Sequence, residues 1–352
     1  MSATTYKVAV VQAAPAFLDR EAGLRKAITL IEDAAAAGAS LIAFPETWIP
    51  GYPFHIWLGA PAYWLQFVQR YFENALSRDG AEERRLCEAA RRNRIHVIMG
   101  HAERDGGSLY MAQWHIDDRG HMLARRRKLK PTHVERAVFG DGDGSDLVVS
   151  DTDLGRVGML CCWEHLQPLT KYAMYAMHEQ IHIAAWPSFN VYGGMVHAFG
   201  PEFNSAASKM YSAEGQCYTL AAYGIVSPEM LDILCDTPDK RAMLGEGGGY
   251  AQIYGPDGRP LADPLPHDQE GLIYADIDLG SIALAKSMAD PVGHYSRPDV
   301  MRLLLDRNPA ERVVTSPPDF GTAIPRPVQA VDAAAGHAIA EPALIGEGAG
   351  SD

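Results

Sequence analysis

The N-terminal part of the chain alternates short apolar runs with a longer amphipathic segment. Residues 6–12 form a β-branched, apolar run of the kind found in buried strands. The following segment, residues 19–37, repeats apolar side chains at helical spacing, at Leu24, Ile28, Ile31 and Ala35. Gly38 ends this expected helix, and residues 41–44 supply a second buried strand. The order strand, helix, strand predicts an α/β fold.

Strands dominate the middle of the chain. A helix over residues 81–92 and a strand over 95–100 repeat the first pattern. Residues 108–116 and 121–129 indicate a hairpin, because the turn Asp-Asp-Arg-Gly separates them. Further strands are expected over 157–162, 181–186, 218–226, 249–254 and 272–279, with a helix over 169–179. Helix–strand pairs with inserted hairpins predict a mixed sheet covered by helices.

The 352-residue chain contains 47% hydrophobic and 21% charged residues, which is enough to bury a sizeable core. Neither an internal repeat nor an inter-domain linker is visible, so we expect one catalytic domain over residues 1–310. From about Pro317 the sequence is rich in Pro, Ala and Gly without periodicity. Residues 311–352 are therefore expected to form a flexible C-terminal extension.

Charge and cysteine usage exclude several classes of protein. A formal net charge of -13 argues against a nucleic-acid partner, which would require clustered Lys and Arg. The N-terminus lacks the features of a signal peptide, and no window approaches the ~20 apolar residues of a membrane span. Five cysteines without a CxxC pair fit a disulfide framework poorly. We therefore expect a cytoplasmic protein with free thiols and without nucleic-acid or membrane partners.

Three reactive side chains, Glu46, Lys128 and Cys162, each follow an expected strand. Ligands in α/β proteins bind where strands end, so these side chains are candidates for one site. Taken singly, each has a structural alternative. Glu and Lys are usually solvated, and a Cys at the end of an apolar strand is usually a small core residue. The basic run 125–128 could equally be a solvated strand end.

The segments around these side chains resemble the signature of the nitrilase superfamily. They read FPETWIPGYP around Glu46, RKLKPTHVER around Lys128 and GMLCCWEH around Cys162, and KSMADPVGHYSRPDV follows later. This set resembles the nitrilase branch more than its amidase and carbamoylase relatives, and the similarity runs over residues 7–306. The resemblance implies an α-β-β-α sandwich, homo-oligomers built from face-to-face dimers that can extend into spirals, and no metal or organic cofactor.

The resemblance also implies a role for each matching residue. Cys162 would be the nucleophile, Glu46 the general base and acid, Lys128 the stabilising cation and Glu135 a supporting carboxylate. Together they would hydrolyse an organic nitrile to the carboxylic acid and ammonia through a thioimidate and an acyl-enzyme on Cys162. A thiolate suits this task because a nitrile carbon is a weak electrophile.

Cys161 competes with Cys162 for the role of nucleophile. Adjacent strand residues point to opposite faces, so at most one of the two faces the pocket. The family pattern selects Cys162, which directly precedes Trp-Glu. Cys161 is then interpreted as a core residue, together with Cys87, Cys217 and Cys235.

The substrate side of the expected site rests on fewer positions. Cys-Trp-Glu-His at residue 162 and the later Trp-Pro-Ser-Phe segment resemble arylacetonitrilases, which act on phenylacetonitrile and mandelonitrile types. Aliphatic nitriles, aromatic nitriles and cyanide stay open as alternatives. The candidate pocket residues are Trp48, Tyr52, Trp57, Trp163, Glu164, His165, Trp186 and Phe189. Core packing or a subunit interface is the alternative for the aromatics, and capping of the next helix is the alternative for Glu164 and His165.

Three rival functions remain as alternatives. His178, Glu179 and His182 match the HExxH pattern of zinc hydrolases. Both histidines would have to share one helix face, yet His182 opens a strand-like run, and no third ligand motif follows. An amidase and a non-catalytic assembly protein with the same fold are the other rivals.

Overall fold

In the computed structural model, which describes residues 5–313, the N-terminal apolar run forms β1 (Thr5–Ala13) at the junction of two sheets. Along most of its length β1 pairs in parallel with β2 (Ala39–Ala43) and antiparallel with β11 (Gly271–Asp278). Only the C-terminal end of β1 pairs with β9 (Tyr218–Gly224). The strand therefore belongs to one sheet and contacts the second at its end.

The β1–β9 pairing joins all eleven described strands into one hydrogen-bonded sheet, which forms two layers, called here the first and the second sheet. The first sheet has the strand order β5-β4-β3-β2-β1-β11. Its other strands are β3 (His96–Asp105), β4 (Ser108–Ile116) and β5 (Met122–Arg127). Strands β2 and β3 are parallel, whereas β3, β4 and β5 form an antiparallel meander. The hairpin expected in this region is β4–β5.

The second sheet has the strand order β10-β9-β8-β7-β6. Its other strands are β6 (Val149–Thr152), β7 (Gly155–Cys161), β8 (Ile181–Trp186) and β10 (Gln252–Tyr254). The three central strands are parallel, and an antiparallel strand pairs at each edge. Both sheets are therefore mixed or carry antiparallel edges, as expected for helix–strand pairs with inserted hairpins.

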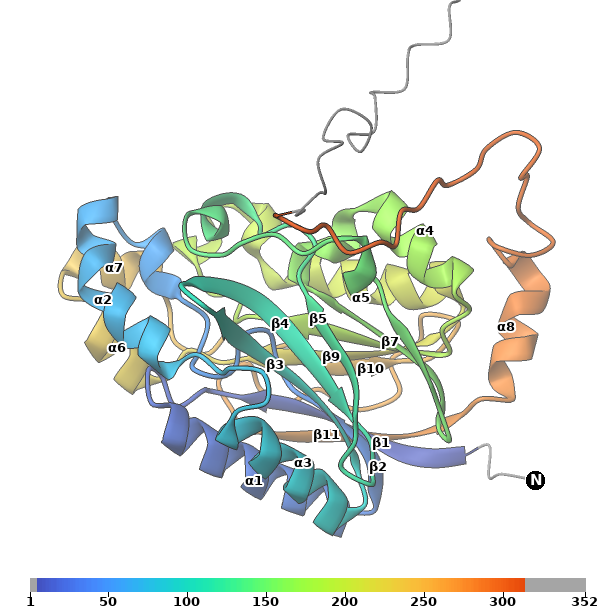
Figure 1. The fold of residues 1–352 in the computed structure, drawn as a ribbon, viewed down its shortest axis with the longest axis horizontal. Coiled ribbons are helices and arrows are strands. Elements are labelled where there is room, and N and C mark those ends of the chain that lie inside the picture. The colour runs from blue at the N-terminus through green and yellow to red at the C-terminus, as the bar shows by residue number, and fades with distance from the viewer. Residues whose placement is uncertain (1–4, 314–352) are drawn as a thin grey trace, which may run out of the picture. The chain divides into compact units, whose positions relative to one another are not determined.

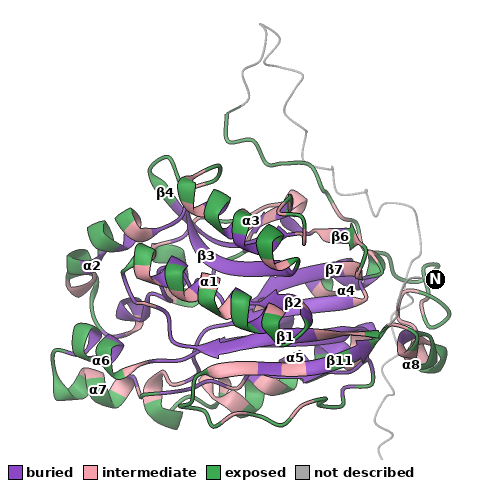
Figure 2. Cartoon of the chain, turned by 90° about the horizontal axis from the view of Figure 1, so that it is seen from below, coloured by how far each residue is buried: buried purple, intermediate pink, exposed green. Residues whose placement is uncertain are grey.

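Helices cover the outer faces of the two sheets (Figure 1). The pair α1 (Arg20–Ala36) and α3 (Ala81–Asn93) lies on the first sheet, and the pair α4 (Pro168–Ala176) and α5 (Pro201–Gly215) lies on the second. The remaining α-helices in the described residues are α2 (Pro61–Asn74), α6 (Pro228–Leu234), α7 (Pro238–Met243) and α8 (Ser281–Ala289). Figure 2 shows that the strands are mostly buried, whereas the outer helix surfaces are exposed.

The alternation of side chains along β1 shows how the layers pack. Val8 and Val10 point into an apolar core that also contains Ile183 of β8, so this core lies between the two sheets. Ala9 and Val11 point the other way and pack in a cluster with Leu24 and other residues of α1. A third cluster joins the second sheet to α4 and α5. The expected α-β-β-α sandwich is confirmed.

The sequence pattern predicted helix α1 correctly but placed its buried face imprecisely. The Asp19 side chain accepts a hydrogen bond from Ala22 N at 2.9 Å and caps the helix. Leu24 and Ile31 are fully buried, as expected. The other buried positions of the helix are Gly23, Ala27 and Ala34, whereas Ile28 and Ala35 are only half-buried. The buried stripe is therefore centred one residue earlier than the larger side chains suggest.

One expected helix boundary in the middle of the chain is wrong, and one alternative that the sequence left open there is ruled out. The helix expected over residues 169–179 ends at Ala176, because His178 takes a positive φ of 57° that redirects the chain into β8. The basic run is not a solvated strand end, because Arg126 and Lys128 are fully buried. Both side chains form ion pairs with buried carboxylates, and these pairs offset the desolvation cost of burying the two positive charges.

Short 3-10 helices occupy several of the connections. They are η1 (Phe54–Trp57), η2 (His133–Ala137), η3 (Gly144–Asp146), η4 (Cys162–Leu166), η5 (Tyr192–Gly194) and η6 (His197–Phe199). Beyond residue 313, the expected C-terminal extension lies outside the described residues. Within residues 5–313, no helix has the length and apolar character needed to cross a bilayer.

Candidate active site

The three reactive side chains predicted from sequence come from the ends of β2, β5 and β7. Lys128 Nζ donates a hydrogen bond to Glu46 Oε1 at 2.9 Å and another to Glu135 Oε2 at 2.8 Å. The side chains of Lys128 and Glu46 are 0% exposed, and that of Glu135 is 1% exposed. The structure therefore gathers two carboxylates around one ammonium group away from solvent.

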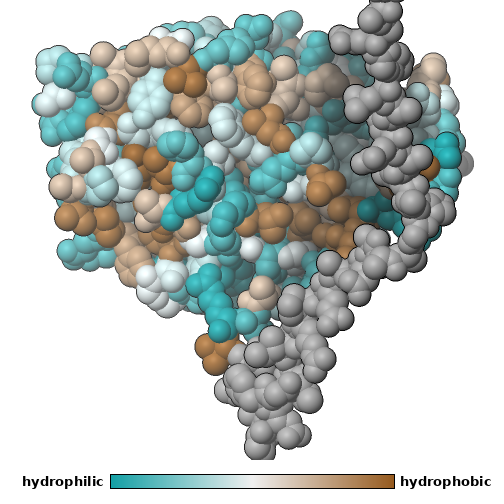
Figure 3. All heavy atoms as spheres, turned by 90° about the horizontal axis from the view of Figure 1, so that it is seen from above, coloured by the Kyte–Doolittle hydropathy of each residue, from teal (hydrophilic) through white to brown (hydrophobic). Residues whose placement is uncertain are grey.

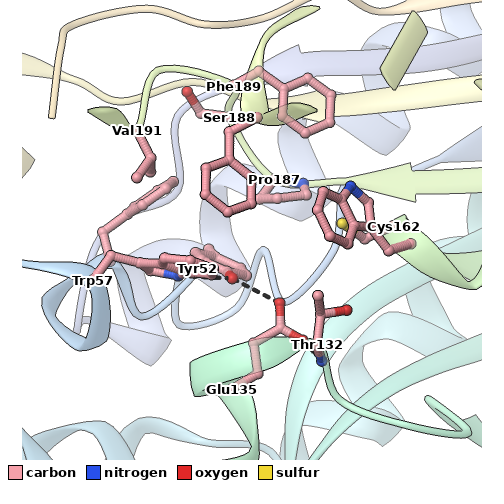
Figure 4. Close-up of a pocket in the computed structure, with 12 residues that line it drawn as sticks. Tyr52, Trp57, Thr132, Glu135, Cys162, Pro187, Ser188, Phe189 and Val191 are labelled. Carbon is pink, nitrogen blue, oxygen red and sulfur yellow. Dashed lines mark hydrogen bonds between the residues drawn. The ribbon is translucent and has the colours of Figure 1, made fainter. Parts of the chain in front are cut away.

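Glu135 is held by contacts on both carboxylate oxygens. Tyr52 Oη donates to Glu135 Oε1 at 2.7 Å, and Thr132 N donates to Oε2 at 2.6 Å (Figure 4). Trp57 Nε1 donates in turn to Tyr52 Oη at 3.1 Å. By contrast, Glu46 Oε2 is buried and has no hydrogen-bond partner among the described residues. Glu46 therefore keeps one oxygen free of hydrogen bonds, whereas both oxygens of Glu135 are occupied.

Cys162 occupies the first position of η4 rather than the last position of β7. Its φ of 45° lies in the left-handed region, and the same holds for Thr47 (φ 43°) and His133 (φ 46°) near the other site residues. Such conformations are uncommon for residues with a Cβ and tend to cluster at functional sites. The alternation of strand faces therefore does not by itself distinguish Cys161 from Cys162. The turn at Cys162 distinguishes them, because it places Cys162 in the pocket lining and leaves Cys161 fully buried.

The pKa values in this cluster are shifted by burial and by neighbouring charges. Burial raises the pKa of the Cys162 thiol well above its usual range, and Glu46 adds to the effect while Lys128 opposes it. Burial also raises the pKa of Glu46 to about 8, with Lys128 opposing and Glu135 adding. Burial alone would lower the pKa of Lys128, but Glu135 and Glu46 outweigh it and the pKa lies well above its usual value. The thiol is neutral at rest and requires a base.

A pocket lies over Cys162, with about 410 Å³ of empty space that includes its mouth open to solvent. The residues that line it are Tyr52, Phe54, Trp57, Thr132, Glu135, Cys162, Trp163, Pro187, Ser188, Phe189, Val191 and Phe199. Figure 4 shows Phe189 across the cavity from Glu135, whereas Tyr52 lies beside Glu135 and bonds to it. The cavity is therefore mostly apolar; Cys162 and Glu135 line it, whereas Lys128 and Glu46 do not.

Four of the eight candidate pocket residues line this cavity, namely Tyr52, Trp57, Trp163 and Phe189. The other four, Trp48, Glu164, His165 and Trp186, do not line it, although Trp48 lines a smaller neighbouring cavity together with Glu46.

The two excluded tryptophans are core residues. Trp48 is 1% exposed, and its Nε1 donates to Ala13 O at 3.0 Å. Trp186 is fully buried, and its Nε1 donates to Ser208 Oγ at 2.8 Å. Each indole N–H has a partner inside the protein, as buried tryptophans require.

Glu164 lies behind the site and bonds to Arg126. Arg126 Nη2 donates to Glu164 Oε1 at 2.7 Å, and Nη1 donates to Oε2 at 2.9 Å. The same carboxylate accepts from Leu129 N at 2.8 Å and from Cys161 N at 2.7 Å. These backbone groups adjoin Lys128 and Cys162, so Glu164 fixes the separation between the two segments that carry them.

The HExxH-like segment is split between two elements. His178 is exposed beyond the end of α4, whereas His182 is fully buried in β8. The two imidazoles therefore do not share a helix face, which removes the geometry that the zinc-hydrolase alternative needs. Among residues 5–313, no group of three His, Cys, Asp or Glu side chains is placed to hold a metal ion.

Six lining residues were not singled out as pocket candidates from the sequence. They are Phe54, Thr132, Pro187, Ser188, Val191 and Phe199. Thr132 has a local signal, because Thr-x-x-Glu marks the capping box that it forms with Glu135. Phe199 belongs to η6, in a segment without periodicity, and only the tertiary fold brings it to the pocket.

Sequence comparison places these observations in a family. The model of the carbon-nitrogen hydrolase family matches residues 7–287. A nitrilase of Pseudomonas syringae pv. syringae (strain B728a) is 58% identical over 88% of this chain and 93% of the relative. An arylacetone-specific nitrilase of Alcaligenes faecalis is 55% identical over 87% of each chain. An aliphatic nitrilase of Rhodococcus rhodochrous is 53% identical over 85% of this chain and 82% of the relative.

The fold is also found among solved structures. A carbon-nitrogen hydrolase from Helicobacter pylori G27 superposes with a TM-score of 0.65, over 84% of this chain and 96% of that chain. At 17% sequence identity, this similarity is evidence for the fold alone. The family model and the relatives, which match most of the chain, carry the assignment further. The chain therefore belongs to the carbon-nitrogen hydrolase family, within its nitrilase branch.

Proposed function

We propose that this protein hydrolyses an arylacetonitrile to the carboxylic acid and ammonia, with Cys162 as the nucleophile. The observation that carries the proposal is the placement of Cys162 and Glu135 at one end of an apolar, aromatic cavity, with Lys128 bonded between Glu135 and Glu46. An apolar cavity suits the uncharged body of a nitrile, and the polar end suits the charge that develops during its hydrolysis.

The first step forms a bond between Cys162 Sγ and the nitrile carbon. The thiol proton passes to the free oxygen of Glu46 and then to the nitrile nitrogen, which gives a neutral thioimidate. Glu46 is suited to this role because its pKa of about 8 lies near neutral pH. The base can thus take the proton and return it within the same step.

Two water molecules complete the reaction. The first adds to the thioimidate carbon, with Glu46 taking its proton, and gives a tetrahedral species on Cys162. Glu46 passes this proton to the nitrogen and then transfers the hydroxyl proton of the tetrahedral species to it as well. Ammonia leaves as the carbon–nitrogen bond breaks and the carbonyl group of the thioester forms. The second water hydrolyses the remaining thioester to the carboxylic acid and returns the proton to the thiol. Lys128 stabilises negative charge on the tetrahedral species, a contribution of about 3 kcal/mol for a well-placed donor.

The preference for an aryl group rests on the cavity walls. Trp57 and Phe199 meet edge to face with ring centroids 5.2 Å apart, and Trp163 stacks on Phe199 at 5.5 Å. Such rings can surround an aromatic substituent from several sides. The relative from Alcaligenes faecalis, which is named for arylacetone specificity, supports the same choice. The aliphatic nitrilase of Rhodococcus rhodochrous makes an aliphatic nitrile the second candidate.

The decisive experiment measures ammonia release from phenylacetonitrile, mandelonitrile, benzonitrile, a short aliphatic nitrile, cyanide and phenylacetamide. Wild type is compared with Cys162→Ala and with Cys161→Ala, each with and without a chelator. We expect chelator-insensitive release from the arylacetonitriles that is lost in Cys162→Ala and largely kept in Cys161→Ala. Faster turnover of an aliphatic nitrile would change the substrate class. Turnover of the amide alone, or none at all, would reject the proposal.

We further propose that the protein works as a homo-oligomer of dimers in the cytoplasm. Apolar side chains are exposed on the outer helices, including Leu169 on α4, Met210 on α5 and Met288 on α8. Figure 3 shows apolar patches among polar ones on one face. All five cysteines are free, which fits a reducing compartment. Light scattering tests the assembly, and cell fractionation tests the location.

A further inference from the structure

A chain of buried hydrogen bonds runs from the backbone of Cys162 to the end of the HExxH-like segment. The Cys162 carbonyl lies 2.6 Å from His165 Nδ1. His165 Nε2 lies 2.9 Å from His182 Nε2, and His182 Nδ1 lies 2.9 Å from Glu179 Oε2. Glu179 Oε1 accepts a short hydrogen bond from Tyr211 Oη. None of these side chains lines the cavity, so the reaction proposed above does not use them directly.

The carbonyl of Cys162 sets the direction of every bond in this chain. A carbonyl only accepts, so His165 Nδ1 must carry a hydrogen. Burial lowers the pKa of both histidines well below the usual value, so both are neutral. His165 Nε2 is then an acceptor, which requires His182 Nε2 to donate. His182 Nδ1 is in turn an acceptor, which requires Glu179 Oε2 to carry a proton.

The surroundings of Glu179 agree with a protonated carboxyl group. The side chain is buried, and burial raises its pKa to about 8. It packs over Gly158 of β7, where an added Cβ would lie 2.0 Å from Glu179 Oε2. The titratable groups around Glu179 are His182, Tyr211, Tyr175, Cys217 and Lys286. Of these, only Lys286 is a permanent cation.

Ring contacts restrain the chain. His182 stacks on Tyr211 with ring centroids 3.7 Å apart, and His165 stacks on Trp186 at 5.0 Å. The bonded atoms therefore cannot easily rotate away from one another. The terminal acceptor is the carbonyl of a residue in the left-handed region, a conformation that persists only when its surroundings hold it.

We propose that His165, His182 and Glu179 are positioning residues that hold the backbone turn of Cys162, and hence its thiol, through a one-directional chain of hydrogen bonds. This inference rests on the proposed role of Cys162 as the nucleophile. Loss of the proton from Glu179 reverses the chain. His182 then donates from Nδ1 to Glu179, His165 donates from Nε2 to His182, and the bare Nδ1 of His165 faces the Cys162 carbonyl.

Two variants separate positioning from plain structural support. Glu179→Gln keeps an N–H donor toward His182 and an acceptor toward Tyr211, but it cannot ionise. His182→Phe keeps the ring and its stacking on Tyr211, but it breaks the chain. We measure kcat and KM for phenylacetonitrile between about pH 6 and pH 10, where the profile reports groups that titrate in the free and bound enzyme. Thermal unfolding is followed alongside.

We expect the alkaline fall of wild-type activity to move to higher pH in Glu179→Gln, with near-wild-type activity at pH 7. His182→Phe should lose kcat by about 10- to 100-fold with KM little changed, because a small displacement of a reacting atom is enough for such a loss. A Glu179→Gln profile identical to that of wild type would overturn the proposal. The pH profile of Glu179→Gln tests the proposal even if His182→Phe fails to fold.

A control that does not depend on nitrile turnover distinguishes failure of the positioning proposal from failure of the proposed function. Iodoacetamide labelling of Cys162, read by mass spectrometry, reports how the thiol is presented whether or not nitriles are substrates. We expect His182→Phe to label about tenfold more slowly than wild type, by the same geometric argument. Equal labelling rates in the folded variant would contradict positioning. Absence of nitrile turnover in wild type, with altered labelling in the variant, would reject only the proposed function.

Discussion

Arg126 and Glu164 form a fully buried, two-pronged ion pair whose carboxylate also accepts hydrogen bonds from the backbone beside Lys128 and Cys162. Arg126 further donates to Gln113 Oε1 and to Asp146 O. Each carboxylate oxygen of Glu164 therefore accepts two hydrogen bonds inside the protein. This pair is the structural connection between the two strand ends that carry the candidate nucleophile and cation.

Replacing Glu164 by Ala should destabilise the protein by about 3–5 kcal/mol, because Arg126 would remain buried without its partner. The free energy of unfolding, measured by urea denaturation, tests this value. The matched control is Lys130→Ala, which removes the exposed pair between Lys130 and Asp141. That change should cost less than about 1 kcal/mol, since exposed ion pairs contribute little. Comparable losses in the two variants would contradict the assigned role of Glu164.

Lys128→Met should lower kcat by at least about 100-fold, the loss typical of removing one donor that stabilises a developing anion. Lys130→Met is the natural comparison, because it alters a lysine two residues away that is exposed and bonded to Asp141. That variant should keep near-normal turnover. Steady-state ammonia release from phenylacetonitrile measures both. A wild-type kcat in Lys128→Met would remove the ammonium group from the mechanism.

The acid side of the pH profile should report Glu46. As a general base, Glu46 must be ionised, so kcat/KM should fall as the pH drops through about 8. Glu135 raises this pKa through its negative charge. Glu135→Gln should therefore move the acid limb to lower pH, in addition to any loss of rate. Tyr52→Phe removes the hydrogen bond to Glu135 without changing the charge of Glu135. The acid limb of the pH profile of this variant should therefore stay at the wild-type pH.

Trp57→Ala should weaken the selection of aryl substrates. The indole lines the cavity and meets Phe199, so its loss should raise KM for phenylacetonitrile by about tenfold while changing KM for a short aliphatic nitrile little. Trp64→Ala provides the comparison, because Trp64 bonds to Gly59 O outside the cavity. Equal changes for both nitriles would show that Trp57 supports the fold rather than substrate choice.

Much of the fold and the centre of the site could be predicted from the sequence because the signals were local. Strand β1 and helix α1 follow from apolar spacing, and the three reactive side chains follow from their positions after strands. Glu46 and Lys128 then meet through the sheet order, which brings the ends of β2 and β5 to one site. The motif resemblance selected the members of this set, and the geometry agrees with it.

The failures arose where a partner lies far away in the sequence. Arg126 belongs to a basic run that looks solvated, and only Glu164, 38 residues later, explains its burial. Glu164 and His165 adjoin Cys162, yet their side chains point to partners behind the site. Phe199 reaches the cavity from a segment without periodicity. Local pattern gives the position of such residues in an element but not the side chain that each one meets.

The burial of the Lys128 cluster has a consequence for the ionic strength at which the protein can work. Dissolved ions screen charges that they can approach, and they screen buried pairs far less. Lys128 and Glu46 are 0% exposed, so added salt does not reach the contact between them. A nitrile carries no net charge, so its approach is not steered by the field of the protein either. Turnover should therefore persist in concentrated salt for as long as the fold itself remains stable.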